Sequence, residues 1–272
     1  MPTTSTAGSP PPLRERVRTA AYVLNGAGRA ALSRLQAIAT EVDVELVEGE
    51  PGAEADLAVV LGGDGTMLHA FHLFLGRSVP VLGVNFGRFG FLASVEPGSL
   101  EDGVRRAFSG DYAVIELPTI DYASGDTRAV AVNDVVAATG ELGRMVELEW
   151  AVGGEPLGEV PCDGVILATP SGSTAYNLSN GGPVLMWGID AIAVSFVAPH
   201  SLHARPLVVP RGRDVVVTNR TRGIALALVS DGRRVGEIPP GETVTASLGE
   251  QRSLLATLPD ATFLTRFRSA FA

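Results

Sequence analysis

Two different hydrophobic patterns divide the chain near residue 115. Before that point, short apolar runs alternate with amphipathic segments of helical length. Such runs are typical of buried parallel strands, with helices that cover both faces of the sheet. The apolar runs lie at residues 20–24, 57–61 and 79–84, and the amphipathic segments at residues 27–39, 66–75 and 99–108. The pattern therefore predicts a Rossmann-like α/β domain over residues 1–115.

Beyond residue 115 the apolar runs are rich in β-branched residues and closely spaced. Turns that contain Gly or Pro separate nearly all of them, which is typical of an antiparallel, sandwich-like β domain. The runs lie at residues 113–117, 129–138, 145–152, 164–168, 191–197, 214–218, 224–229 and 243–248. We place this second domain at residues 116–255. Residues 256–272 have a helical pattern, and we expect them to return to the first domain.

Composition and charge exclude several classes of function. All 21 basic residues are arginine. A chain without lysine has neither a Schiff-base lysine nor the lysine of a GxxxxGK[ST] phosphate loop. The net charge of −9 also gives no basic footprint for nucleic acid or for an anionic membrane. An anionic ligand must therefore be held by backbone N–H groups, a few arginines or a metal ion.

The ends and the cysteine content predict a soluble, cytoplasmic protein. Cys162 is the single cysteine, so an internal disulfide is impossible. Residues 1–12 are rich in Thr, Ser and Pro and lack the pattern of a secretion signal, so we expect a disordered tail. No apolar stretch approaches the roughly 20 residues that a membrane helix needs.

A glycine turn follows the apolar run at residues 57–61 and opens the next helix. It consists of Gly62, Gly63, Asp64, Gly65 and Thr66. Glycines at a strand-to-helix turn let the backbone approach a phosphate, and the helix N-terminus offers unpaired N–H groups. A carboxylate there repels phosphate unless it holds a metal ion or takes a proton from an attacking hydroxyl. The alternative interpretation of Asp64 is a helix N-cap.

Two further segments are rich in polar groups. Residues 169–183 follow the apolar run at residues 164–168 and contain small hydroxyl residues and a double glycine, which suits a ribose, a phosphate or an adenine edge. Tyr176 in this segment can stack on a base or bond to the backbone. Asn133 and Asp134 interrupt an apolar strand and can bind vicinal ribose hydroxyls. A β-bulge or an internal turn is the alternative for this pair.

These segments together resemble the ATP-dependent NAD kinase family. The resemblance covers residues 56–232. It rests on Gly62, Gly63, Asp64, Gly65 and Thr66, on Gly83, Val84 and Asn85 with Gly90, Phe91 and Leu92, on Asn133 and Asp134, on Asp163 and Gly164 with residues 169–183, and on Pro199, His200, Ser201 and Leu202 with Arg205, Pro206 and Leu207. The glycine turn alone also resembles lipid kinases and phosphofructokinases, whereas the segment at residues 169–183 is far more specific.

The resemblance implies a set of roles for these residues. Asp64 would be the catalytic carboxylate that accepts the proton of the adenosine 2′-hydroxyl of NAD. Phosphate and ATP binding would fall to Gly62, Gly63, Gly65 and Thr66. NAD binding would involve Asp64, Gly65, Asn133, Asp134, Arg144, Asp163, Thr174, Ala175, Tyr176, Asn177, Leu178, Ser179 and Ala198. The family architecture, an α/β domain followed by a β domain, agrees with the pattern break near residue 115.

The same resemblance implies the substrates and partners. ATP and NAD would be the substrates, Mg²⁺ the expected divalent metal with unknown ligands, and a homodimer or homotetramer the assembly, in which one subunit completes its neighbour's site. Pro161 and Arg233 depart from the residues that are usual at their positions, which leaves the choice between NAD and NADH open. The phosphoryl donor, ATP or polyphosphate, is open as well.

Alternative functions and sites remain at this stage. A related kinase that acts on a lipid hydroxyl, or a non-catalytic dinucleotide-binding sensor, would share parts of the pattern. His69 and His72, and likewise His200 and His203, have spacings compatible with metal binding, but we expect packing or solvent exposure instead. We expect Cys162 to be a packed thiol and Arg205 to contact a ligand or another subunit.

Overall fold

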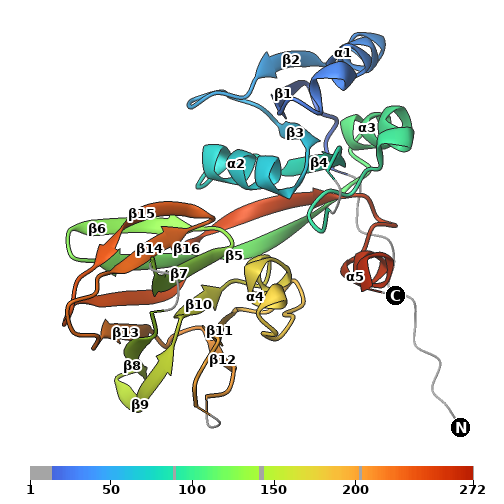
Figure 1. Cartoon of the computed structure of the whole chain (residues 1–272). Helices are drawn as coiled ribbons and strands as arrows, with labels where there is room; N and C mark the ends of the chain where they lie inside the picture. Colours follow the sequence, from blue (N-terminus) through green and yellow to red (C-terminus); the bar gives the residue numbers. More distant parts are fainter. Residues whose placement is uncertain (1–13, 88–89, 141–143, 202–203, 272) are drawn as a thin grey trace, which may run out of the picture. The chain divides into compact units, whose positions relative to one another are not determined.

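The structure is a computed structural model that describes residues 14–87, 90–140, 144–201 and 204–271. The predicted disorder of residues 1–12 lies outside this part of the chain. Two compact units are formed (Figure 1). The first contains Met1–Leu73, Ser78–Ile115 and Leu254–Ala272, and the second contains Phe74–Arg77 and Glu116–Ser253.

The first unit is built on a parallel sheet in the order β2-β1-β3-β4, which the end of β16 extends. The strands are β1 (Thr19–Leu24), β2 (Glu45–Glu48), β3 (Leu57–Gly62), β4 (Val81–Asn85) and β16 (Thr243–Thr257), and the helices are η1 (Arg29–Ala31), α1 (Leu32–Glu41), α2 (Asp64–Phe74), η2 (Pro97–Ser99), α3 (Leu100–Phe108) and α5 (Phe263–Phe271). All residues of β3 are buried, as expected for a strand covered on both faces.

The strand order places a topological switch point beside β3. The chain moves from β1 outward to β2 on one side, and from β3 to β4 on the other. Helices α1 and α3 pack together in one core with β1 and β3, while α2 connects β3 to β4. Ligands of open α/β sheets bind outside the carboxyl ends of the strands at such a switch point. The turn after β3 therefore lies where a nucleotide is expected.

The second unit is a sandwich of two antiparallel sheets. One sheet contains β5 (Ala113–Ser124), β6 (Thr127–Ala131), β8 (Val146–Val152), β9 (Glu155–Cys162), β13 (Val215–Asn219) and most of β16. The other runs in the order β12 (Leu207–Pro210), β11 (Ala191–Val197), β10 (Gly164–Ala168), β7 (Asp134–Thr139), β14 (Leu226–Ser230) and β15 (Arg233–Ile238). Two short helices, η3 (Gly172–Thr174) and α4 (Tyr176–Ser179), follow β10.

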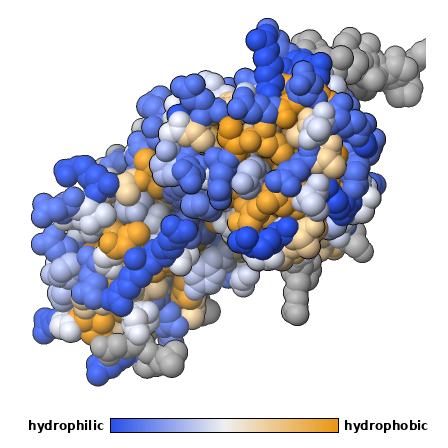
Figure 2. All heavy atoms as spheres, turned by 90° about the horizontal axis from the view of Figure 1, so that it is seen from above, coloured by the Kyte–Doolittle hydropathy of each residue, from blue (hydrophilic) through white to orange (hydrophobic). Residues whose placement is uncertain are grey.

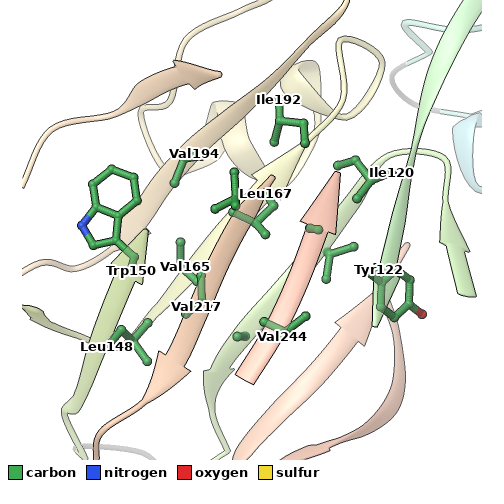
Figure 3. Close-up of a cluster of buried hydrophobic side chains, with 14 of the residues drawn as sticks. Ile120, Tyr122, Leu148, Trp150, Val165, Leu167, Ile192, Val194, Val217 and Val244 are labelled. Carbon is green, nitrogen blue, oxygen red and sulfur yellow. The ribbon is translucent and has the colours of Figure 1, made fainter. Parts of the chain in front are cut away.

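Alternating apolar residues of both sheets form the core of the sandwich (Figure 3). In β8, Val146, Leu148, Trp150 and Val152 are buried while their neighbours are more exposed. The rings of Trp150 and Phe196, one from each sheet, meet edge to face at 5.2 Å between centroids. Together, the parallel α/β unit and this sandwich confirm the predicted fold class.

Polar and apolar residues are mixed on the visible face of the molecule. In Figure 2, polar residues divide the apolar surface of the visible face into separate patches. Within the described ranges, no helix is both long enough and apolar enough to cross a bilayer.

Candidate functional site

The glycine turn of the first unit joins β3 directly to α2. Gly62 ends β3 and α2 begins at Asp64, so Gly63 occupies the N-cap position and its carbonyl accepts the N–H groups of Thr66 and Met67. A Cβ on Gly62 would lie 2.4 Å from Oγ1 of Thr66, so a side chain does not fit there. The interpretation of Asp64 as an N-cap is therefore wrong. The free N–H groups of the first helical turn lie at the switch point, as an anion site requires.

The carboxylate of Asp64 is held by a neighbouring loop. Its Oδ2 accepts the N–H of Phe91 at 2.9 Å, and its Oδ1 accepts the N–H of Leu92 at 3.1 Å. Burial raises the pKa of Asp64 above its usual value, although the two N–H bonds and the charge of Arg266 oppose the shift. A raised pKa makes a carboxylate a better proton acceptor near neutral pH. Asp64 thus has the properties of a general base.

In the second unit, Asn133 lies in a bend at residues 132–133, and Asp134 is the first residue of the strand that follows. The predicted strand at residues 129–138 is wrong, because β6 ends at Ala131, β7 begins at Asp134, and the two strands belong to different sheets. The carboxylate of Asp231 holds this bend by accepting the N–H groups of Val132, Asn133 and Asp134 at 2.6–3.1 Å. The internal turn left open as the alternative is the observed structure.

Asn133 has a buried acceptor without a partner. Asn133 is 6% exposed, and its side-chain Oδ1 accepts no hydrogen bond from any described residue. An unpaired buried polar atom costs about 1–3 kcal/mol. Native proteins keep such atoms where a ligand or a water supplies the missing donor. A sugar hydroxyl is a donor of suitable size.

The hydroxyl-rich segment after β10 packs directly against this bend. Thr169 donates its N–H to the carbonyl of Asn133 at 2.8 Å and its Oγ1 to the carbonyl of Val132 at 2.7 Å. Ser171 Oγ donates to the carbonyl of Val132 at 3.1 Å. A Cβ on Gly172 would lie 2.0 Å from the carbonyl oxygen of Asn133. The structure therefore brings residues 133–134 and 169–174 together, and the approach requires glycine at position 172.

Helix α4 presents different side chains to solvent and to the interior. Tyr176 is 46% exposed, so its ring is available for stacking, and Ser179 is exposed as well. Thr174, Ala175 and Leu178 are half-buried. Asn177 is fully buried, donates to the carbonyls of Ser173 and Pro183, and accepts from Ser195. Its side chain therefore supports the segment from within.

Three other predicted site residues lie at the opposite end of the sandwich. Asp163 precedes β10, and its backbone forms hydrogen bonds with Thr139 and Val197. Ala198, which follows Val197, is exposed and has a positive φ of 44°. Arg144 precedes β8, whose first residue pairs with Cys162, next to Asp163. Since β10 has five residues, about 17 Å separates its ends. The chain does not bring this group to Asn133.

Asp134 gives a prediction about stability. Burial, followed by the charge of Asp231, raises its pKa to about 7. Between about pH 4 and pH 7 the native state holds a proton that the unfolded state releases, so stability falls as pH rises through this window. Asp134→Asn removes the penalty and should stabilise the protein at pH 8 by up to about 4 kcal/mol while weakening NAD binding. Urea unfolding at pH 5 and pH 8 measures the effect.

The exposed Asp126 of the same unit is the control for this variant. We expect Asp126→Asn to keep the pH dependence of the parent protein. An equal pH slope of stability in Asp134→Asn and in the parent would contradict the assignment.

Two supporting residues were not predicted as part of a site. Asp231 at φ 48° and Gly232 at φ 75° form the turn between β14 and β15. An Asp-Gly pair after an apolar run is a hairpin signal that could have placed Asp231. Arg266 lies far along the chain from the turn after β3, and no local pattern marks it.

The remaining candidates differ in their exposure to solvent. His69, His72 and His200 are exposed, and His203 lies outside the described residues. Across the described ranges, no three His, Cys, Asp or Glu side chains are grouped so as to hold a metal. Cys162 is buried, and burial raises the pKa of its thiol to about 12, which fits a packed, unreactive thiol. Arg205 is exposed, and its Nη1 donates to the adjacent carbonyl of Ala204.

The first unit is Rossmann-like and has a carboxylate of raised pKa in its glycine turn, and the second is a β sandwich with a hydroxyl-rich loop. This combination is that of a nucleotide-dependent phosphotransferase. Comparison with known families identifies which one. The family model of the ATP-NAD kinase N-terminal domain matches residues 28–112, and that of the C-terminal domain matches residues 132–258. The chain belongs to the ATP-NAD kinase family.

Individual relatives agree with this assignment. The NAD kinase of Thermobifida fusca is 42% identical over 84% of this chain and 74% of its own length. That of Gemmatimonas aurantiaca is 40% identical over 78% of this chain and 76% of its own. A crystal structure of an NAD kinase from Archaeoglobus fulgidus in complex with ATP has a TM-score of 0.77, with 26% identity, over 93% of this chain and 97% of that chain.

Proposed function

We propose that the chain transfers the γ-phosphoryl group of ATP to the adenosine 2′-hydroxyl of NAD, which gives NADP and ADP. The observation that carries this proposal is the half-buried carboxylate of Asp64, with its raised pKa, in the glycine turn at the switch point. Family membership supplies the reaction, and the carboxylate supplies the group that the reaction needs. Asp64 takes the proton of the 2′-hydroxyl as that oxygen forms its bond to the γ-phosphorus and the bond to ADP breaks.

Positioning and electrostatic stabilisation provide most of the rate enhancement in phosphoryl transfer. The chain has no lysine, so the N–H groups around Gly63 and Gly65 hold the phosphates, with the hydroxyl of Thr66 beside them. Because the described residues contain no cluster that could hold a metal on its own, Mg²⁺ enters as part of the metal–ATP substrate. Bound to ATP, the metal would neutralise part of the negative charge of the phosphates.

The second unit binds NAD in this proposal. The unpaired Oδ1 of Asn133 accepts a hydrogen bond from a ribose hydroxyl, and Asp134 binds beside it. Tyr176 stacks on a base, while Thr174, Ala175, Leu178 and Ser179 border the adenosine. Small polar side chains suit a nucleoside better than an acyl chain, which favours NAD over a lipid acceptor.

Asp163, Arg144 and Ala198 complete the site of another copy of the chain. The length of β10 separates them from Asn133 within one copy, and in this proposal the dinucleotide contacts the two groups where two copies meet. This proposal requires a homodimer or homotetramer, and we propose a cytoplasmic location, which agrees with a single, buried cysteine.

An assay with defined acceptors and donors tests the proposed function. Purified protein is incubated with Mg²⁺ and ATP or polyphosphate, together with NAD, NADH or a diacylglycerol, and the products are separated by mass. We expect NADP from NAD and ATP, and no phosphorylated lipid. A protein that binds NAD but forms no phosphorylated product would instead be a dinucleotide sensor.

A further inference from the structure

Arg266, on the C-terminal helix α5, is a buried arginine whose three guanidinium nitrogens all donate hydrogen bonds. Only 8% of the surface of Arg266 is exposed to solvent. Nη1 donates to the carbonyls of Phe91, Leu92 and Ala93 at 2.6–3.0 Å, and Nη2 donates to Oγ1 of Thr257 at 2.8 Å. Nε donates to the carbonyl of Ala261 at 3.3 Å. The planar guanidinium offers donors in a rigid fork that an ammonium group cannot reproduce.

The loop that Arg266 holds is the loop that holds Asp64. Phe91 and Leu92 donate their N–H groups to the carboxylate of Asp64, while their carbonyls accept from Arg266. One side of this short stretch of backbone therefore faces the guanidinium, and the other faces the carboxylate. A rotation of these peptides that lengthens the bonds to Arg266 also moves both N–H donors relative to Asp64.

The two side chains also interact through their charges. Burial lowers the pKa of Arg266 to about 10, and Asp64 opposes that shift, so Arg266 is charged at neutral pH. In return, the positive charge lowers the pKa of Asp64 and limits the effect of burial. Arg266 thus affects Asp64 in two ways. It holds the loop that donates hydrogen bonds to the carboxylate, and its positive charge lowers the pKa of the carboxyl group.

We propose that Arg266 is a positioning residue for phosphoryl transfer, because it fixes the backbone of Phe91 and Leu92 that orients the Asp64 carboxylate. This inference rests on the proposed function, in which Asp64 is the general base. It assigns to the C-terminal helix a role in the reaction that goes beyond closing the first unit.

Arg266→Lys and Arg266→Met test this role. Lysine keeps the charge but loses the fork, and methionine loses both. We expect kcat to fall about 10- to 100-fold in both variants, since a small misplacement of a catalytic group has effects of this size, with KM for ATP and NAD nearly unchanged. The acidic limb of the kcat profile should move to higher pH in Arg266→Met, and much less in Arg266→Lys. Arg268→Met, exposed on the same helix, is the control and should match the parent.

A titration of the Asp64 carboxyl carbon by NMR, assigned with Asp64→Asn, follows the same groups without activity. We expect its pKa to rise in Arg266→Met. The inference would be overturned if the folded Arg266 variants kept the parental kcat and the pKa of Asp64 did not change. The proposed function would be overturned instead if the parent protein formed no NADP. Should Arg266→Met fail to fold, Arg266→Lys and Thr257→Val, which removes one partner of the guanidinium, decide the question.

Discussion

Replacing Asp64 by asparagine is expected to lower kcat by about 10²- to 10⁴-fold, the usual contribution of a general base. The asparagine Oδ1 still accepts one of the N–H groups of Phe91 and Leu92, whereas its amide nitrogen accepts neither and cannot take the proton of the 2′-hydroxyl. Burial already disfavours the charge at this position, so loss of the charge should not unfold the protein. Steady-state rates of NADP formation, measured with a thermal unfolding curve, give the effect.

Asp102→Asn is the matched control, because this carboxylate is exposed in the first turn of α3 in the same unit. We expect it to retain the parental kcat. If Asp64→Asn kept more than about a tenth of the parental kcat, a factor well below that of a general base, the role of Asp64 would have to be abandoned.

Gly172→Ala should have the largest effect in the second unit. The added methyl group would lie 2.0 Å from the carbonyl oxygen of Asn133, so either the bend at residues 132–133 or the segment after β10 must move. We expect a loss of about 3 kcal/mol in the free energy of unfolding, near the upper end for overpacking, together with a strong loss of NAD affinity. Urea unfolding and calorimetric titration with NAD measure the two effects.

Gly236→Ala in β15 is the control, since the nearest atom to its new methyl group, Oγ1 of Thr127, is 3.9 Å away. Its stability and NAD affinity should stay close to those of the parent. Normal NAD binding by Gly172→Ala would show that the contact between this segment and Asn133 does not shape the NAD site.

The sequence pattern predicts the buried strands well and the edge strands poorly. Apolar runs identify β3 and β10, in which every residue is buried, and the predicted strand at residues 191–197 matches β11. The four strands β2, β9, β12 and β15 were missed, and each lies at a sheet edge, where most side chains are exposed. An exposed edge imposes no apolar pattern, so periodicity cannot find it.

Other errors have similarly local causes. The helix predicted at residues 27–39 begins only at Leu32, after the short η1, because residues 25–28 form a turn closed by Oδ1 of Asn25. The single strand predicted at residues 129–138 contains a change of sheet. Apolar residues continue on both sides of that bend, so the apolar pattern does not show that the chain changes sheets there.

The candidate site likewise combines segments that are local in the sequence with contacts between residues far apart in the chain. The glycine turn, the pair at residues 133–134 and the hydroxyl-rich segment are each contiguous in sequence, so the sequence alone identifies them as candidates. Arg266 acts on a loop more than 170 residues away, and Asp231 on a bend nearly 100 residues away. Only the folded chain reveals such partners.

A crystal structure of the assembled protein with NAD bound tests the central claim most directly. The decisive quantity is the distance from the carboxylate of Asp64 to the adenosine 2′-oxygen. We predict about 2.6–3.2 Å, the range of a hydrogen bond that can pass a proton. A carboxylate that faces neither this oxygen nor a water bound to it, with NAD otherwise seated on Asn133, would contradict the assignment of Asp64 as the base.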